Sequence, residues 1–231
     1  MIDPAKCVIL TPVAHSIEPA CEEGLRELEK RGFAVRRVRG YSAIDIARCQ
    51  LSTDAVRDGF EATMWIDSDI GFQADDVEKL CQHNVPLVCG IYPQKGKRVL
   101  ACRLLPGTKE VMFGKSGGLI EIEYAGTGFL LVRAEVYRTI QEKLQLPVCN
   151  EQFQRPMVPY FQPQIISTAK GPWYLAEDFS FSERARQAGF KIHADTSIRL
   201  KHFGSYGYGW EDAGSEVKRY ANYRFLSGET Q

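Results

Sequence analysis

Long apolar runs are absent from this sequence, and so is any excess of charge of one sign. No stretch approaches the roughly 20 consecutive apolar residues that a membrane-spanning helix needs, and the first apolar run, Val8-Ile9-Leu10, is too short for the core of a secretory signal. The 29 basic and 29 acidic residues cancel, and the pI is near 6.9, so no global field favours nucleic acid or an anionic membrane. We therefore expect a cytoplasmic protein with no membrane span.

Paired cysteines are missing as well. The seven cysteines are scattered, odd in number and never spaced as Cys-x-x-Cys, which favours reduced thiols over a disulfide framework. Several, such as Cys89, stand inside apolar runs and are expected to be buried thiols. Repeats, low-complexity tracts and an interdomain linker are also lacking. At 231 residues and 44% hydrophobic, the chain can bury about 70–75% of its unfolded surface as a single domain.

Apolar runs alternate with amphipathic stretches along the first hundred residues. Runs of this kind, closed by turn residues, are typical of buried parallel strands, and the stretches between them have helical spacing. The alternation predicts an α/β fold, a doubly wound and mostly parallel sheet flanked by helices. The expected strands are 7–10, 33–38, 62–66 and 87–91, and the expected helices begin near Ser16, Ser42 and Asp75.

The second half of the chain has a different rhythm. We expect a small antiparallel hairpin of 111–113 and 119–124, joined by a glycine-rich turn and followed by a strand at 129–132. Residues 147–174 hold five of the eleven prolines and several aromatic residues, which we interpret as an irregular active-site loop. The remaining expected elements are helices over 135–144 and 178–188 and short strands at 191–194 and 197–200.

Two aspartates close the third expected strand, in the segment Met64-Trp65-Ile66-Asp67-Ser68-Asp69. Extended chain places residues two apart on one side, so Asp67 and Asp69 are predicted to aim at one point while Ser68 faces away. Two such carboxylates suit a hard divalent cation, which often shares its shell with substrate phosphates. The alternative is a plain polar turn. Because Thr11-Pro12 and Tyr92-Pro93 also end strands, the three loops are expected to converge on one crevice.

Three further features are candidates for a site: Gly126-Thr127-Gly128, the pair Glu177-Asp178 at a helix start, and His202. Each alone has a structural explanation. The glycines fit a tight turn, the acidic pair complements a helix dipole, and a single histidine is most often structural. Their order along the chain carries more information than any one of them.

Together and in this order, these segments resemble the fold-A (GT-A) glycosyltransferases that use nucleotide sugars. The family's Asp-x-Asp motif resembles Asp67-Ser68-Asp69, and its glycine loop before a core strand resembles Gly126–Leu131. Its acidic helix start resembles Ala176–Phe179, and its C-terminal metal-binding histidine resembles His202. The similarity runs from about Val8 to Tyr208 and is strongest to small phage-like and bacterial members.

The resemblance implies one GT-A (Rossmann-like) domain over 1–231, with a nucleotide-binding half at 1–100, an acceptor and catalytic half at 101–210, and a C-terminal tail at 211–231. It implies a metal-dependent transfer from a nucleoside diphosphate sugar, by family frequency a UDP-sugar, to an acceptor hydroxyl. The acceptor stays open between a small molecule, a glycan, a protein and a modified nucleic-acid base. The sugar and the oligomeric state stay open too.

The resemblance also implies roles for individual residues. Asp69 and His202 would bind Mn²⁺ or Mg²⁺, with Asp67 reaching the metal directly or through water, or holding the ribose. Asp178 would be the general base of an inverting transfer, with Glu177 holding sugar hydroxyls; in a retaining enzyme the two would only position donor and acceptor. The expected donor contacts are Thr11, Pro12, Val13, Arg48, Asp67, Ser68, Gly126, Thr127, Gly128 and Trp173.

Other classes of protein are weighed against this one. A nucleotidyltransferase shares the topology but would carry a glycine-rich, basic loop after the first strand, where Thr11–His15 has neither glycine nor arginine. A non-catalytic module that binds nucleotide sugars or carbohydrates would keep the pocket without turnover. A phosphatase of the haloacid-dehalogenase type is disfavoured because it needs Thr or Val where Gly71 stands.

Overall fold

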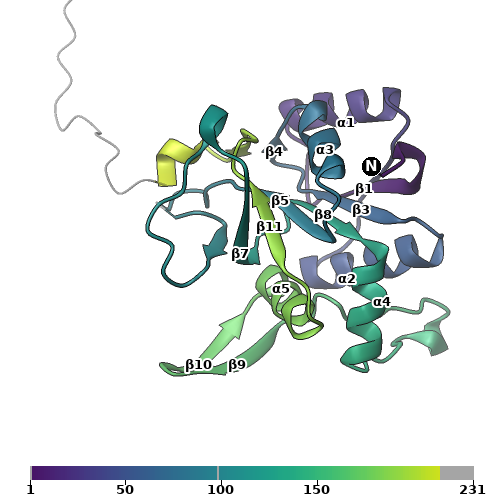
Figure 1. Ribbon diagram of the computed structural model, residues 1–231. Helices are drawn as coiled ribbons and strands as arrows, with labels where there is room; N and C mark the ends of the chain where they lie inside the picture. The colour runs from purple at the N-terminus through teal and green to yellow at the C-terminus, as the bar shows by residue number, and fades with distance from the viewer. Residues whose placement is uncertain (1, 98, 214–231) are drawn as a thin grey trace, which may run out of the picture.

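An eight-stranded sheet forms the centre of the computed structural model, which describes residues 2–97 and 99–213 (Figure 1). The strand order is β2-β1-β3-β8-β5-β11-β7-β6, and β8 and β7 run against the other strands. Two smaller sheets join β13-β12-β4 and β10-β9. The bounds are β1 Cys7–Pro12, β2 Ala34–Val38, β3 Ala62–Ile66, β4 Ile70–Gly71, β5 Leu87–Gly90, β6 Cys102–Leu104, β7 Leu119–Ala125, β8 Phe129–Arg133, β9 Gln164–Thr168, β10 Gly171–Leu175, β11 Ile192–Asp195, β12 Lys201–Phe203 and β13 Gly207–Tyr208.

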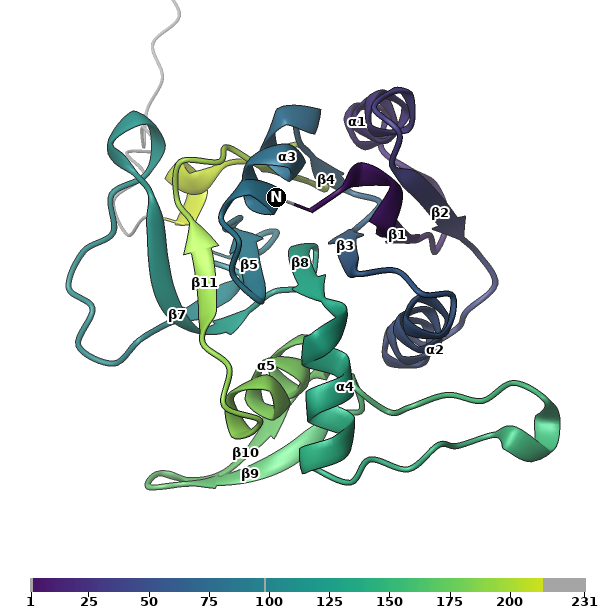
Figure 2. The same ribbon diagram turned by 45° about the vertical axis from the view of Figure 1, so that its right-hand side comes forward.

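Helices cover both faces of the central sheet (Figure 2). Helices α1 and α3 pack in one apolar cluster on one face, and α2, α4 and α5 pack in a second cluster on the other. The helix bounds are α1 Pro19–Lys30, α2 Ile44–Arg57, α3 Ala74–Gln82, α4 Ala134–Lys143 and α5 Glu177–Gln187, with short 3₁₀ helices η1 Pro4–Lys6, η2 Gly114–Ser116, η3 Glu151–Phe153 and η4 Trp210–Ala213. This arrangement confirms the predicted α/β fold, a doubly wound, mostly parallel sheet flanked by helices.

The two-sided burial explains why the central strands are apolar throughout. Side chains along a strand point to alternate faces, so Val8 and Trp65 pack toward α2, α4 and α5, whereas Ile9 and Met64 pack toward α1 and α3. All four side chains are fully buried. A strand covered on both faces needs apolar residues at every position, which is the pattern that made β1 and β3 recognisable.

The predicted hairpin differs from the structure in its first strand. Residues 111–113 are not a strand, and β7 pairs instead with β6. The reason is tertiary: the amide of Gly114 donates to the carbonyl of Thr196 at 3.0 Å, and Phe113 packs against Trp210 at 5.0 Å between ring centroids. The glycine-rich segment is therefore fixed against the end of β11 and does not close a hairpin.

Two other expectations need correction. The segment 147–174 is not irregular throughout, because its C-terminal part forms the antiparallel hairpin of β9 and β10. Residues 197–200 are not a strand, since the amide of Ser197 donates to Asp195 Oδ1 at 2.8 Å and turns the chain. In the predicted tail 211–231, residues 214–231 lie outside the described part of the chain. Across residues 2–97 and 99–213, no helix has both the length and the apolar character to cross a bilayer.

Candidate active site at the carboxyl ends of the strands

The loops that carry the predicted site residues meet at one edge of the central sheet. β1, β3 and β5 are parallel in direction, so Pro12, Asp67 and Tyr92 follow or end strands at the same edge. β8 is antiparallel, so its first residue, Phe129, pairs with Ile66 at that edge too. This pairing places the glycine loop 126–128 beside Asp67, whose amide donates to the carbonyl of Gly128 at 3.0 Å. The predicted convergence of the loops is therefore present.

Asp67 faces a buried arginine. Arg48 donates from Nη2 to both carboxylate oxygens of Asp67, at 2.9 and 3.2 Å, and its side chain is 3% exposed. Its Nε lies 3.7 Å from Glu177 Oε1, so one cation joins α2, the end of β3 and the start of α5. Within the described residues, Nε and Nη1 of Arg48 have no hydrogen-bond partner. Two buried donors of the guanidinium thus lack a hydrogen bond, whereas buried donors are normally satisfied.

Asp69 faces a different set of partners. The chain turns after β3, with the amide of Ile70 bonded to the carbonyl of Asp67 at 3.0 Å, so Asp67 and Asp69 do not share partners as the extended-chain prediction assumed. His202 Nε2 lies 3.6 Å from Asp69 Oδ1, and Lys95 donates to Oδ2. Burial alone would raise the pKa of Asp69, but His202 and Lys95 together lower it to about 2.

The geometry of His202 fits a metal ligand. Its Nδ1 lies 2.8 Å from the carbonyl of Pro93; because a carbonyl can only accept, Nδ1 is the donor of this bond, and Nε2 is the ring nitrogen on the side of Asp69 that a metal could bind. Such a carbonyl partner is usual for metal-binding histidines. Across the described residues, no group of three or more His, Cys, Asp or Glu side chains could hold a metal. Asp69 and His202 are two possible ligands, and a divalent cation bound by them would need its other ligands from a bound phosphate or from water.

Asp178 lies in a low-dielectric setting at the start of α5. Burial, with the nearby carboxylate of Glu177, raises the pKa of Asp178 to about 6 from 3.8, although the amide of Phe179 and the charge of Arg48 oppose the shift. The Phe179 amide donates to Asp178 Oδ1 at 2.7 Å. A carboxylate with a pKa close to neutrality is a better proton acceptor than an ordinary aspartate, as general-base catalysis requires.

A pocket of about 330 Å³ opens between α2 and the ends of β1 and β3, a size that suits a small ligand. Predicted donor contacts that line it are Pro12, Val13, Arg48, Asp67 and Ser68, and the predicted metal ligand Asp69 and the predicted sugar-holding Glu177 line it too. Thr11 is fully buried behind them. Trp173 lies elsewhere: it packs beside Tyr124 and Phe179, with the guanidinium of Arg103 over its ring at 4.7 Å.

Three side chains at the site were not among the predicted residues. Tyr41 lines the pocket, Lys95 bonds Asp69, and the Tyr92 hydroxyl accepts a hydrogen bond from the Gly128 amide of the glycine loop at 2.8 Å. For Tyr92 and Lys95, the sequence offered one signal: both lie just after the predicted strand 87–91, where ligands are expected to bind. For Tyr41, the loop before the second helix carried no comparable pattern.

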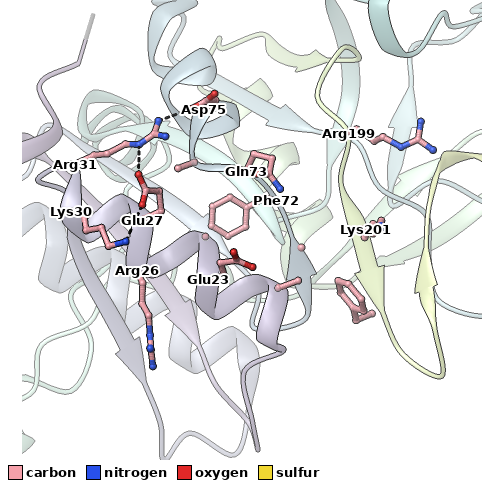
Figure 3. Close-up of a pocket in the computed structure, with 15 residues that line it drawn as sticks. Glu23, Arg26, Glu27, Lys30, Arg31, Phe72, Gln73, Asp75, Arg199 and Lys201 are labelled. Carbon is pink, nitrogen blue, oxygen red and sulfur yellow. Dashed lines mark hydrogen bonds and ion pairs between the residues drawn. The ribbon is translucent and has the colours of Figure 1, made fainter.

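A second, larger pocket of about 640 Å³ is lined by other residues than the pocket between α2 and the ends of β1 and β3 (Figure 3). It is bordered by α1, by the segment 71–75 and by alternate residues of the chain at Arg199, Lys201 and Phe203. Many of its charges neutralise one another: Arg31 binds Asp75 at 2.6 Å and Glu27 at 3.3 Å. Lys201 and Phe203 line it but His202 between them does not, so this pocket lies on the opposite side of β12 from His202.

Comparisons with protein-family models and with curated proteins find no match. Among solved structures, the chain is similar to A197 from STIV, with a TM-score of 0.55 and 17% identity over 86% of this chain and 85% of that chain. This similarity shows a shared fold. Weaker similarities are to GalNAc-T7 solved with UDP, GalNAc and Mn²⁺ (TM-score 0.46, 13% identity, 85% of this chain and 43% of that chain) and to a structure of S. aureus TarS with UDP-GlcNAc (TM-score 0.36, 9% identity, 82% and 55%). At these scores neither establishes a common fold.

Proposed function

We propose that the protein is a metal-dependent glycosyltransferase that moves a sugar from a nucleoside diphosphate sugar, with UDP as the expected nucleotide, to an acceptor hydroxyl. The observation that carries the proposal is the placement of two different acidic sites at one sheet edge. Asp69 stands 3.6 Å from His202, and Asp178, with its raised pKa, begins the helix whose Glu177 reaches Arg48. A cation-binding site at Asp69 and His202, with a separate carboxylate that can accept a proton at Asp178, suits the displacement of a diphosphate by a hydroxyl group.

The donor side of the site is assigned to the pocket of about 330 Å³. Pro12, Val13 and Tyr41 form walls that suit a nucleobase, and Asp67 is placed to bind a ribose hydroxyl. The Nη1 donor of Arg48, which has no hydrogen-bond partner among the described residues, suits a phosphate or sugar oxygen. Asp69 and His202 would hold Mn²⁺ or Mg²⁺, which would supply neutralisation of the departing diphosphate.

The acceptor side is assigned to the start of α5. In an inverting transfer the acceptor hydroxyl approaches from the side opposite the diphosphate, so the proton acceptor must be separate from the metal pair. Asp178 fills that role by taking the hydroxyl proton as the new glycosidic bond forms, and Glu177 holds hydroxyls of the transferred sugar. Ionised Asp178 is the active form, so transfer should fall as pH drops below about 6.

The proposal is tested by nucleoside diphosphate release from a panel of nucleotide sugars, with Mn²⁺ or with a chelator, alongside calorimetric titration of the nucleotides. The wild type is expected to bind one nucleotide sugar, or to release its nucleoside diphosphate, and the chelator should abolish this. Asp69→Asn and His202→Ala should lose the same binding or release. His193→Ala is the matched control, since His193 lies on β11 and pairs within the sheet. Metal-dependent binding that survives in both site variants would refute the metal assignment, and binding without transfer to any acceptor would favour a non-catalytic module.

A further inference from the structure

Tyr92 lies beneath the glycine loop and beside the proposed metal ligand, yet neither the sequence motifs nor the proposed mechanism assigns it a role. Its side chain follows β5 and is 6% exposed. The Gly128 amide donates to its hydroxyl at 2.8 Å, and its ring packs edge-on against the ring of His202, with centroids 5.1 Å apart. The next residue, Pro93, supplies the carbonyl that fixes His202 Nδ1. Tyr92 and Pro93 together therefore contact both the glycine loop and His202.

The close approach of Tyr92 accounts for Gly128 and contributes at Gly126, where a Cβ would also lie 2.4 Å from the carbonyl of Ala101. Neither Gly126 nor Gly128 has a positive φ, so backbone conformation does not require glycine at either position. Space does: a Cβ at Gly128 would lie 2.5 Å from the Tyr92 hydroxyl and 2.9 Å from Asp67 Oδ2, and a Cβ at Gly126 would lie 2.8 Å from the same hydroxyl. The hydroxyl and the Asp67 carboxylate thus approach the same point on the Gly128 backbone.

The contacts form a continuous path from β5 to Asp67. The Tyr92 hydroxyl accepts from the Gly128 amide, and the Gly128 carbonyl accepts from the Asp67 amide at 3.0 Å. Resting on the proposed function, we propose that Tyr92 is a positioning residue: its hydroxyl fixes the glycine loop, and through it Asp67, while its ring fixes His202, so that donor and metal bind to a preformed site. It contacts no reacting atom in this scheme.

A matched control exists in the same protein. Tyr137 is buried as well, with none of its surface exposed, and its hydroxyl lies 2.9 Å from both Trp65 Nε1 and Thr63 Oγ1. That hydroxyl belongs to the core beneath α4 and does not contact the glycine loop or His202. Tyr92→Phe and Tyr137→Phe therefore remove the same atom from two buried tyrosines, and only the first removes it from the site.

The experiment measures Mn²⁺ and UDP binding, by electron paramagnetic resonance and calorimetry, and amide hydrogen exchange of Gly128 in the ligand-free protein. Tyr92→Phe is expected to weaken Mn²⁺–UDP binding roughly 10-fold, the lower end for loss of a group that orients a metal ligand, and to speed Gly128 exchange. Tyr137→Phe is expected to lower the melting temperature while leaving binding within about twofold of the wild type. Equal effects of both variants on binding, or an unchanged Gly128 amide in Tyr92→Phe, would overturn the proposal.

A second pair of variants covers the case in which Tyr92→Phe folds poorly. Gly128→Ala places a methyl group against the hydroxyl, so its binding defect should be partly relieved in the double variant Tyr92→Phe/Gly128→Ala; strictly additive losses would contradict the contact. The exchange readout also separates this proposal from the proposed function. If the wild type binds neither Mn²⁺ nor UDP, the function is wrong, while Gly128 exchange in the same samples still decides whether Tyr92 fixes the loop.

Discussion

Replacing Asp178 with asparagine is expected to make the folded protein more stable at neutral pH while abolishing transfer. Burial, with Glu177 close by, raises the pKa of Asp178 to about 6 from 3.8. A carboxyl group whose folded pKa lies above its unfolded value opposes folding when it is ionised. The opposition is complete above the folded value, is relieved as pH falls through about 6, and is absent well below 3.8.

The magnitude follows from that shift. At about 1.4 kcal/mol per pKa unit, a rise from 3.8 to about 6 makes ionised Asp178 destabilising by about 3 kcal/mol at pH 7.5. By pH 4.5 the difference between Asp178→Asn and the wild type should fall to about 1 kcal/mol, because the folded wild type has taken up its proton. The asparagine carbonyl can still accept from the Phe179 amide, which now bonds Oδ1 at 2.7 Å.

The assay is urea unfolding at the two pH values, with Glu177→Gln as the control on the same turn of α5. That control removes an equal charge from the helix start but loses the contact with buried Arg48, at 3.7 Å, so it should destabilise by about 1–3 kcal/mol. Opposite signs for the two variants are the expected result. An Asp178→Asn protein no more stable than the wild type at pH 7.5, or a gain independent of pH, would refute the burial argument.

Three other substitutions test the structure around the site. Arg48→Met should destabilise the protein by about 3–5 kcal/mol in urea unfolding, because the carboxylates of Asp67 and Glu177 lose the buried positive charge that they face. A loss below about 1 kcal/mol would contradict this expectation. Gly126→Ala, whose Cβ would lie 2.4 Å from a backbone carbonyl, should lower the melting temperature, whereas Gly118→Ala, with open space around it, should not. Phe181→Ala should lose about 3–5 kcal/mol from the core, while Phe153→Ala, 72% exposed, should stay within about 0.5 kcal/mol.

The strands that carry the site were predictable because burial on both faces leaves a local signature. Cys7–Leu10 and Ala62–Ile66 are apolar at nearly every position and end in Thr11-Pro12 and in Asp67, which marks both the strand and the place where a ligand can bind. Pairing was not predictable in the same way. The antiparallel insertion of β8 between β3 and β5 depends on contacts between distant segments.

The β9–β10 hairpin shows how tertiary contacts override a weak local pattern. Its sequence carries a proline and exposed apolar residues, Ile165 at 69% and Tyr174 at 63%, so alternation gave no clear strand signal. The hairpin is held instead from outside, because Ser180 of α5 accepts from the Gln164 amide at 3.1 Å and donates to the Leu175 carbonyl at 2.9 Å. One buried hydroxyl thus fixes both strands of the hairpin.

Residue types and their order were enough to predict which chemical groups lie at the sheet edge: two aspartates after a strand, a glycine loop, an acidic helix start and a late histidine. The partners of these groups depend on the fold. It turned Asp67 toward Arg48 and Asp69 toward His202, and it set Tyr92 beneath Gly128. The physical reason is that burial and pKa depend on groups brought together by packing of distant segments, whereas residue type and spacing constrain only what each segment can offer.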